Sequence, residues 1–187
     1  MTTPSAARRP AVFLDRDGTI IEDTGYISKP EHVALRPGAA DGIARLNRAD
    51  VPVIVISNQS GIGRGLYGEA DYDRVRARVD AVLRAQGAHV DATYICPHAP
   101  RADGSAPCEC RKPGTLLYLQ ASETLGLDPA RSWYIGDRWR DVAPAEHLGG
   151  RGILVPSPRT PAEELARARE HFDVAPTLAA AVEQILK

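Results

Sequence analysis

Ala11-Val12-Phe13-Leu14-Asp15-Arg16-Asp17-Gly18-Thr19 is the stretch of sequence that decides the fold. A short apolar run that ends in polar residues and a glycine predicts a buried strand leading into a turn. The strand brings two carboxylates, Asp15 and Asp17, to its carboxyl end. Such a pair can attack an electrophile, transfer a proton and hold a divalent cation.

An ordinary Asp-Gly turn is the alternative interpretation of this stretch. A calcium loop of the EF-hand type is disfavoured, because Gly18 comes two positions too early and Tyr26 occupies the place of the bidentate Glu.

Length and composition are those of an ordinary globular protein. We expect one domain over residues 11–187, after a short flexible tail at 1–10, in a chain of 187 residues. The 23 Lys and Arg nearly balance the 24 Asp and Glu, so no basic excess favours nucleic acid as a partner. No apolar run approaches the ~20 residues of a membrane span, and three cysteines make no disulfide framework. Coiled-coil heptads are absent from the sequence. These features predict a cytoplasmic monomer that binds a small molecule, and neither nucleic acid nor a membrane.

Apolar, β-branched runs alternate along the chain with segments of helical period, which predicts βαβ units and a parallel sheet. The expected strands cover 12–14, 51–56, 92–95, 133–135 and 153–155, and the expected helices cover 39–48, 69–86, 115–125, 142–148, 161–171 and 177–186. The predicted fold class is therefore α/β: a three-layer α/β/α Rossmann-like domain with a mainly parallel sheet and no large cap domain. Ligands of such sheets bind beyond the carboxyl ends of the strands. Two long non-periodic stretches, 21–36 and 97–113, follow strand ends there.

The second expected strand leads into Ser57 and Asn58, whose hydroxyl, amide and neighbouring backbone N–H groups can bind oxyanions. A Ser/Asn turn cap is an equally good interpretation of these two residues alone. The following Gly61-Ile62-Gly63-Arg64-Gly65 resembles a dinucleotide fingerprint, but Leu66 stands where the third glycine is needed. We expect these glycines to form a mobile or closely approached loop that presents Arg64.

Charged residues mark two further positions. Lys112 precedes Pro113, which we expect at the first position of a helix. A lysine at a helix start opposes the helix dipole, which hints at a function, although a solvated surface lysine is the simpler interpretation. Asp137 follows the fourth expected strand as a third carboxylate at a strand end, whereas helix capping is sufficient to explain Asp141.

A metal site is predicted in the loop 96–110. It contains all three cysteines of the chain and one histidine, as two close pairs: Cys96 with His98, and Cys108 with Cys110. Four such ligands favour a closed, tetrahedral and therefore structural Zn²⁺ site over a set of unrelated thiols. Zinc would hold the 97–113 stretch in one shape and so direct Arg111 and Lys112, which follow immediately.

Four motifs follow one another between about residues 11 and 156: the Asp-x-Asp-Gly-Thr that begins at Asp15, Ser57-Asn58, Lys112, and the Gly-Asp-x-x-x-Asp that ends at Asp141. Together and in this order they resemble the haloacid dehalogenase-like phosphohydrolase superfamily. The resemblance implies that Asp15 is the nucleophile and that Asp17 is the general acid and then the general base. It further implies that Ser57 hydrogen-bonds the phosphoryl oxygens and that Lys112 neutralises charge. It also implies a Mg²⁺ site made by Asp15, the backbone carbonyl of Asp17 and Asp137. The chemistry agrees, because a carboxylate approaches an anionic phosphate only where positive charge offsets the repulsion.

The arrangement Cys-x-His…Cys-x-Cys-Arg-Lys-Pro is similar to that of the D-glycero-D-manno-heptose 1,7-bisphosphate 7-phosphatases. This resemblance implies removal of the 7-phosphate through an aspartyl-phosphate, in the synthesis of nucleotide-activated heptose for lipopolysaccharide or S-layer precursors. The implied substrate contacts are Asp23, Thr24, Gly25, Tyr26, Asn58, Gln59, Ser60, Arg111 and Arg138. Histidinol-phosphate phosphatases share the zinc loop and all four motifs, and they remain the alternative. A non-catalytic zinc module and a nucleotide-cofactor oxidoreductase are more distant alternatives.

Overall fold

The computed structural model describes residues 7–187, so residues 1–6 of the predicted tail lie outside the described part of the chain. Pairing with the domain begins before the predicted boundary at residue 11. Arg9 forms a parallel bridge with Leu127, and its carbonyl accepts the N–H of Asp128 at 2.8 Å.

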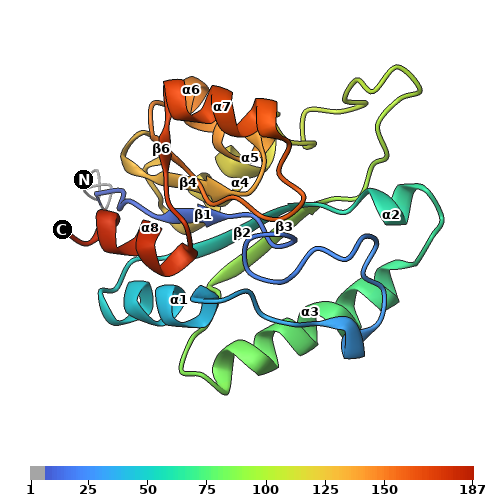
Figure 1. The fold of residues 1–187 in the computed structure, drawn as a ribbon, viewed down its shortest axis with the longest axis horizontal. Helices are drawn as coiled ribbons and strands as arrows, with labels where there is room; N and C mark the ends of the chain where they lie inside the picture. The colour runs from blue at the N-terminus through green and yellow to red at the C-terminus, as the bar shows by residue number, and fades with distance from the viewer. Residues whose placement is uncertain (1–6) are drawn as a thin grey trace, which may run out of the picture.

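The described strands form one parallel sheet in the order β3-β2-β1-β4-β5-β6 (Figure 1). They are β1 (Val12–Leu14), β2 (Val53–Asn58), β3 (Ala92–Cys96), β4 (Trp133–Gly136), β5 (Arg151–Leu154) and β6 (Asp173–Val174). From β1 the chain builds one half of the sheet through β2 and β3, and then crosses to the other side with β4. The carboxyl ends of β1 and β4 therefore border the crevice at which the strand order reverses, where open α/β sheets bind ligands.

Helices cover both faces of the sheet, which confirms the predicted three-layer α/β class. They are α1 (Ala39–Arg48), α2 (Ser60–Gly63), α3 (Glu69–Arg84), α4 (Leu116–Leu125), α5 (Trp139–Val142), α6 (Pro144–Leu148), α7 (Ala162–His171) and α8 (Leu178–Ile185), with short 3₁₀ turns η1 (Pro30–His32) and η2 (Pro129–Arg131). In Figure 1, α1, α3 and α8 lie below the sheet and α4 to α7 lie above it.

Side-chain alternation in the strands builds the two cores. Val12 and Leu14 of β1 face the core shared with α1, α3 and α8, whereas Phe13 faces the opposite core. There the Phe13 ring lies 5.3 Å from that of Tyr118 on α4 and 5.2 Å from that of Tyr134 on β4. Because both faces of β1 are buried, the strand is a continuous apolar run, as parallel strands generally are.

Four features differ from the expected elements. The helix expected over 142–148 is two short helices, α5 and α6, because Pro144 has no N–H to donate and begins a new helix. Residues 60–63, expected to be loop, form α2, and the two residues of β6 are too few to produce a sequence pattern. Pro113 is not at the first position of a helix, since α4 begins at Leu116.

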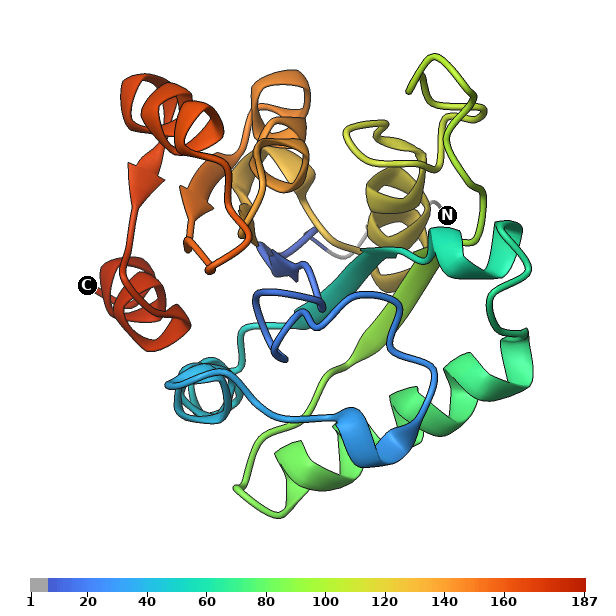
Figure 2. The same cartoon turned by 45° about the vertical axis from the view of Figure 1, so that its right-hand side comes forward.

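The 97–113 segment extends from the carboxyl edge of the sheet and lies next to α2 in both Figure 1 and Figure 2. The contact is close because Gly63 of α2 has no side chain: a Cβ at this position would lie 2.6 Å from the Pro97 carbonyl oxygen. The backbone N–H of Gly63 donates to the same oxygen at 2.9 Å. Gly63 thus serves close packing against the predicted metal loop, whereas Gly61 packs against the Tyr67 ring.

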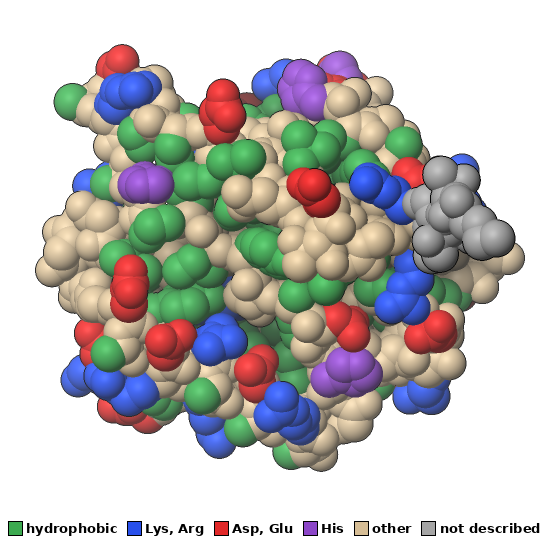
Figure 3. Space-filling view, turned by 180° about the vertical axis from the view of Figure 1, so that it is seen from behind, with side chains coloured by type: hydrophobic (Ala, Val, Ile, Leu, Met, Phe, Trp, Pro, Cys, Tyr) green, Lys and Arg blue, Asp and Glu red, His purple; other side chains and the backbone are tan. Residues whose placement is uncertain are grey.

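Basic and acidic side chains are interspersed on the face shown in Figure 3. Across residues 7–187, none of the helices combines the length and apolar character needed to cross a bilayer.

Candidate active site

Asp15, the first residue after β1, lies at the centre of a buried ionic cluster. Its Oδ1 accepts a hydrogen bond of 2.6 Å from Lys112 Nζ, which also donates to the Ile56 carbonyl at 2.7 Å and lies 2.7 Å from Asp141 Oδ1. The Lys112 side chain is 1% exposed, so it is neither a solvated surface lysine nor a residue at a helix start. Asn58 fixes its backbone, because its side chain accepts the Lys112 N–H at 3.0 Å and donates to the Lys112 carbonyl.

Asp137, the first residue after β4, is held by two hydroxyl groups. Ser157 Oγ donates to its Oδ2 at 2.6 Å, and Thr160 Oγ1 donates to its backbone carbonyl at 2.6 Å. Its carboxylate lies against Gly18, which has a φ of 90° and would bring any Cβ into contact with Asp137. Gly18 is therefore required twice, for the left-handed backbone and for this close approach.

The side chains of Asp15, Asp137 and Asp141 form a group that fits a divalent cation. One oxygen atom from each lies within 4.8 Å of the others, and all three residues are buried. Asp137 Oδ1 has no hydrogen-bond partner in the described residues, although it is buried. Three carboxylates and the single ammonium of Lys112 leave two negative charges in excess, which one divalent cation would balance.

The same crowding perturbs the acidities of this cluster. Burial is the main cause that raises the pKa of Asp15; the Lys112 ammonium opposes it, and Asp141 and Asp137 add to it, which gives a pKa of about 8. Burial and the Asp141 carboxylate raise the pKa of Asp137 to about 6. Burial acts to lower the pKa of Lys112, but Asp141 and Asp15 outweigh it and the pKa is raised. Lys112 therefore stays an ammonium.

Asp17 and Ser57 are joined by the buried amide of Gln59. Gln59 Nε2 donates to Asp17 Oδ2 at 2.8 Å and to Ser57 Oγ at 2.7 Å. Its Oε1 accepts from Tyr67 at 2.7 Å and from Arg16 at 3.1 Å, so the two donors fix the orientation of the amide. Arg16 also donates to both carboxylate oxygens of Asp17. The Asp17 carboxylate is thus held by Gln59 and Arg16 and is not part of the Asp15, Asp137 and Asp141 group.

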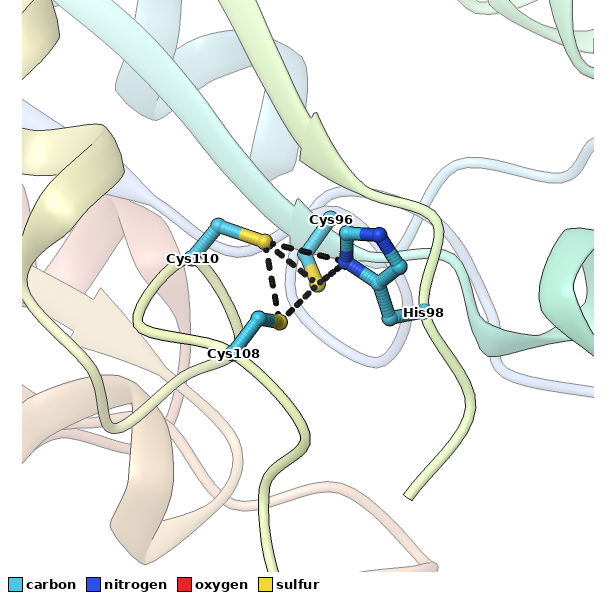
Figure 4. Close-up of side chains that lie close together, drawn as sticks. All are labelled: Cys96, His98, Cys108 and Cys110. Atoms are coloured by element: carbon cyan, nitrogen blue, oxygen red, sulfur yellow. Dashed lines mark hydrogen bonds between the residues drawn. The ribbon is translucent and has the colours of Figure 1, made fainter. Parts of the chain in front are cut away.

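Figure 4 shows the predicted zinc ligands, Cys96, His98, Cys108 and Cys110, pointing toward one another. Neighbouring ligand atoms lie 3.0 to 3.6 Å apart. The three thiols are free, and their sulfur atoms are farther apart than the about 2.0 Å of a disulfide. This spacing fits four ligands around one tetrahedral ion with bonds to sulfur of about 2.3 Å. The loop then leads directly to Arg111, whose Nη1 donates to the His98 carbonyl at 3.2 Å.

A cavity of about 320 Å³ lies next to Asp15 and Asp17 at the carboxyl edge of the sheet. Most of the predicted substrate contacts line it: Asp23, Gly25, Tyr26, Asn58, Gln59, Ser60 and Arg111, together with Asp15 and Asp17. Ser57, Lys112 and Asp137 lie deeper and are almost fully buried. Thr24 and Arg138 are not among the lining residues. Arg138 turns to α7, where Glu164 accepts hydrogen bonds from its Nε at 3.0 Å and its Nη2 at 2.6 Å.

Two residues of the cluster were not predicted from the sequence. Asp141 does accept the N–H of Arg138 at 3.0 Å, as helix capping requires, but it also contacts Lys112. Its spacing of four residues from Asp137 was the available signal. Arg16 offered none, because an arginine between two aspartates is ordinarily exposed, whereas this one is 3% exposed and lies over the Tyr72 ring.

Comparison with known proteins agrees with this geometry. Residues 109–181 match the model of a family described as HAD-hydrolase-like. The strand order, the carboxylates that follow β1 and β4 and the buried lysine are consistent with that match. The fold and the site thus define a phosphoric monoester hydrolase of the haloacid dehalogenase-like class.

The closer relatives carry one name. A D-glycero-beta-D-manno-heptose-1,7-bisphosphate 7-phosphatase of Mesorhizobium japonicum is 41% identical over 152 residues, which cover 78% of this chain and 69% of the relative. One from Escherichia coli O6:H1 is 36% identical over 163 residues, covering 84% and 86%. The crystal structure of the D,D-heptose 1,7-bisphosphate phosphatase from B. bronchiseptica, complexed with magnesium and phosphate, superposes with a TM-score of 0.83 at 33% identity and covers 95% of this chain and 98% of that one. The chain belongs to this family of heptose bisphosphate phosphatases.

Proposed function

We propose that this protein removes the 7-phosphate of D-glycero-β-D-manno-heptose 1,7-bisphosphate, with Asp15 as the nucleophile. The observation that carries the proposal is the contact of Lys112 Nζ with Asp15 at 2.6 Å, at the edge of a cavity and beside two further buried carboxylates. The names of the relatives supply the substrate and its β anomer.

In the first step an Asp15 oxygen forms a bond to phosphorus, the bond from phosphorus to the sugar oxygen breaks, and Asp17 gives its proton to the leaving oxygen. In the second step Asp17 accepts a proton from water, whose oxygen attacks phosphorus and releases the Asp15 carboxylate. Lys112 and the Ser57 hydroxyl bind the phosphoryl oxygens as charge moves between them. Gln59 holds Asp17 and Ser57 in register throughout.

Asp15, Asp137 and Asp141 carry the carboxylates that would hold Mg²⁺, and the Asp17 carbonyl is a further proposed ligand. When bound, Mg²⁺ offsets the repulsion between the substrate phosphate and these carboxylates. For the Cys96, His98, Cys108 and Cys110 cluster we propose a structural zinc ion, since four protein ligands leave no position for a reacting molecule. The three free thiols support a reducing, cytoplasmic location, and a monomeric state stays a prediction.

The test is phosphate release from the 1,7-bisphosphate, with the product identified as the 1-phosphate or the 7-phosphate. Wild-type protein with Mg²⁺ is expected to yield the 1-phosphate, and Asp15→Asn is expected to lose turnover while keeping its far-UV circular dichroism spectrum. Histidinol phosphate is the comparison substrate. A higher kcat/KM for histidinol phosphate, or normal turnover by the folded Asp15→Asn variant, would contradict the proposal.

A further inference from the structure

The cavity is lined by more arginines than carboxylates, so some of the arginines have no acidic partner. Five arginines line it: Arg16, Arg64, Arg111, Arg140 and Arg159. Arg16 is bound to Asp17, and Arg159 lies 3.3 Å from Asp23 at the entrance. The third lining carboxylate, Asp15, is paired with Lys112. Among the described residues, no carboxylate lies within hydrogen-bond distance of the remaining three guanidinium groups, those of Arg64, Arg111 and Arg140.

The three arginines come from three separate elements and meet at one wall of the cavity. Arg64 ends α2, Arg111 follows the predicted zinc loop, and Arg140 belongs to α5. All three line the same cavity, and Arg111 is close enough to Arg140 and to Arg64 for the guanidinium groups to repel one another. Like charges held this close favour an anion between them.

Arg140 is the member of this group that the structure singles out. Its side chain is 40% exposed, yet its Nε is buried and has no hydrogen-bond partner in residues 7–187. The nearest acidic atom, Asp141 Oδ1, is 3.9 Å away and is already paired with Lys112. Arg138, two residues earlier, is held by its bidentate pair with Glu164 and does not line the cavity.

We infer that Arg140, together with Arg111 and Arg64, binds a second phosphate of the substrate and sets a preference for bisphosphates over monophosphates. The inference rests on the proposed function. It assigns Arg140, in place of Arg138, as the specificity-determining residue on the segment that follows Asp137. The planar guanidinium groups match the paired oxygens of a phosphate, and three positive charges suit an anion of about −2.

The rival role for Arg140 is contact with the phosphoryl group that is transferred. The two roles differ in their kinetic signatures. A residue that binds the second phosphate acts on bisphosphates and mainly through KM, whereas a residue at the transferred group lowers kcat for every substrate. Lys112 lies below the cavity and contacts Asp15, so a cation is already in place for the transferred phosphoryl group, which favours the first role for Arg140.

The experiment compares heptose 1,7-bisphosphate with heptose 7-phosphate as substrates for wild type, Arg140→Gln, Arg140→Lys and Arg138→Gln. Arg140→Gln is expected to lower kcat/KM for the bisphosphate by ~10- to 100-fold, the range of a charge-assisted hydrogen bond, with a clearly smaller loss on the monophosphate. Arg140→Lys recovers only part of the preference, because it keeps the charge and loses the planar fork. Arg138→Gln keeps the wild-type preference. Arg84→Gln, an exposed arginine at the end of α3, is the control for removing a positive charge.

Three results would overturn the inference. They are an unchanged ratio of the two kcat/KM values in Arg140→Gln, an equal loss of kcat on both substrates, and loss of the preference in Arg138→Gln instead. Failure of wild type to hydrolyse either heptose phosphate overturns the proposed function, and the inference with it. Calorimetric titration of Asp15→Asn and Asp15→Asn/Arg140→Gln with the bisphosphate supplies a readout that needs no turnover. Weaker binding by the double variant is the supporting result, and equal binding contradicts the inference.

Discussion

The side chain of Gln59, a residue that is 2% exposed, makes four hydrogen bonds. Each joins it to a residue that the proposed mechanism uses or that orients such a residue. Replacing it with methionine keeps the length of the side chain and removes every polar atom. Asp17 and Ser57 then lose their common donor, and Tyr67 and Arg16 lose their acceptor.

Gln59→Met is accordingly expected to lower kcat by about 10- to 100-fold, as loss of an orienting partner does at comparable sites. It should also lower the free energy of unfolding by roughly 1–3 kcal/mol, because buried donors are left unsatisfied. Steady-state kinetics and urea denaturation measure the two effects. Tyr67→Phe removes one hydrogen bond at Oε1 and serves as the matched control. A smaller kinetic effect of Gln59→Met than of Tyr67→Phe would contradict the orienting role.

Ser157 tests the environment of Asp137. Its hydroxyl donates to Asp137 Oδ2 and opposes the rise in the pKa of that carboxyl. Ser157→Ala is expected to raise this pKa further above about 6, so protons compete better with Mg²⁺ at pH 6 than at pH 8. The Mg²⁺ concentration for half-maximal activity should increase by about tenfold at pH 6 and by less at pH 8. The same increase at both pH values would show that Ser157 acts in some other way.

At the scale of an element, the 97–113 loop depends on the cluster that anchors it. Cys96 ends β3, Cys108 and Cys110 lie next to Lys112, and the His98 carbonyl accepts a hydrogen bond from Arg111. The proposed zinc ion would join these points, restrict the loop and keep Arg111 over the cavity. On that proposal the loop is a part of the active site.

Cys108→Ser is expected to abolish stoichiometric zinc, to lower the thermal unfolding midpoint by several degrees and to reduce kcat/KM. Elemental analysis, calorimetry and kinetics measure the three quantities. Asp103→Ala is the control, since Asp103 lies in the same loop and bonds only the nearby Ser105 N–H at 2.9 Å. A structural zinc site would be contradicted if purified wild-type protein contained no zinc and had the same thermal unfolding midpoint as Cys108→Ser.

At the scale of the whole molecule, the strand order places the carboxyl ends of β1 and β4 side by side and so concentrates negative charge in the interior. The pKa values of Asp15, about 8, and Asp137, about 6, are raised from 3.8, so between pH 3.8 and 8 these two groups bind more protons in the folded protein than in the unfolded chain. The stability of the metal-free protein contributed by these groups is therefore present at low pH and is lost as the pH rises toward 8.

Mg²⁺ should reverse this trend, because the cation replaces the protons. Mg²⁺ bound to the folded protein raises the free energy of unfolding by about 2.7 kcal/mol when its concentration is 100 times its Kd. At a fixed Mg²⁺ concentration this stabilisation is expected to grow between pH 6 and pH 8. Thermal unfolding with and without Mg²⁺ at both pH values measures it, and Ca²⁺-free EDTA buffers give the baseline. A Mg²⁺-induced shift in midpoint that is larger at pH 6 than at pH 8 would contradict this account.

Asp141 and Arg138 make tertiary contacts that the local sequence pattern did not predict. Helix capping explains Asp141 within its own segment, and its spacing of four residues from Asp137 did not reveal that it contacts Lys112. Arg138 follows the metal-site aspartate directly, which made it the natural substrate contact, yet Glu164, 26 residues later, binds it. In both positions a partner distant in the sequence decides what the side chain does.

The alternation of buried runs and helical segments determined the α/β class, and the polar residues after each strand marked the reacting edge of the sheet. The class follows from the periodicity of neighbouring residues, and the reacting edge follows from the geometry of parallel strands, so both can be predicted from local sequence. The tertiary structure alone decided the burial of Lys112, the four side-chain hydrogen bonds of Gln59 and the pairing of Arg138 with Glu164. These depend on hydrogen bonds and charges between segments that meet only in the folded chain, where the cost of an unpaired buried charge selects one arrangement.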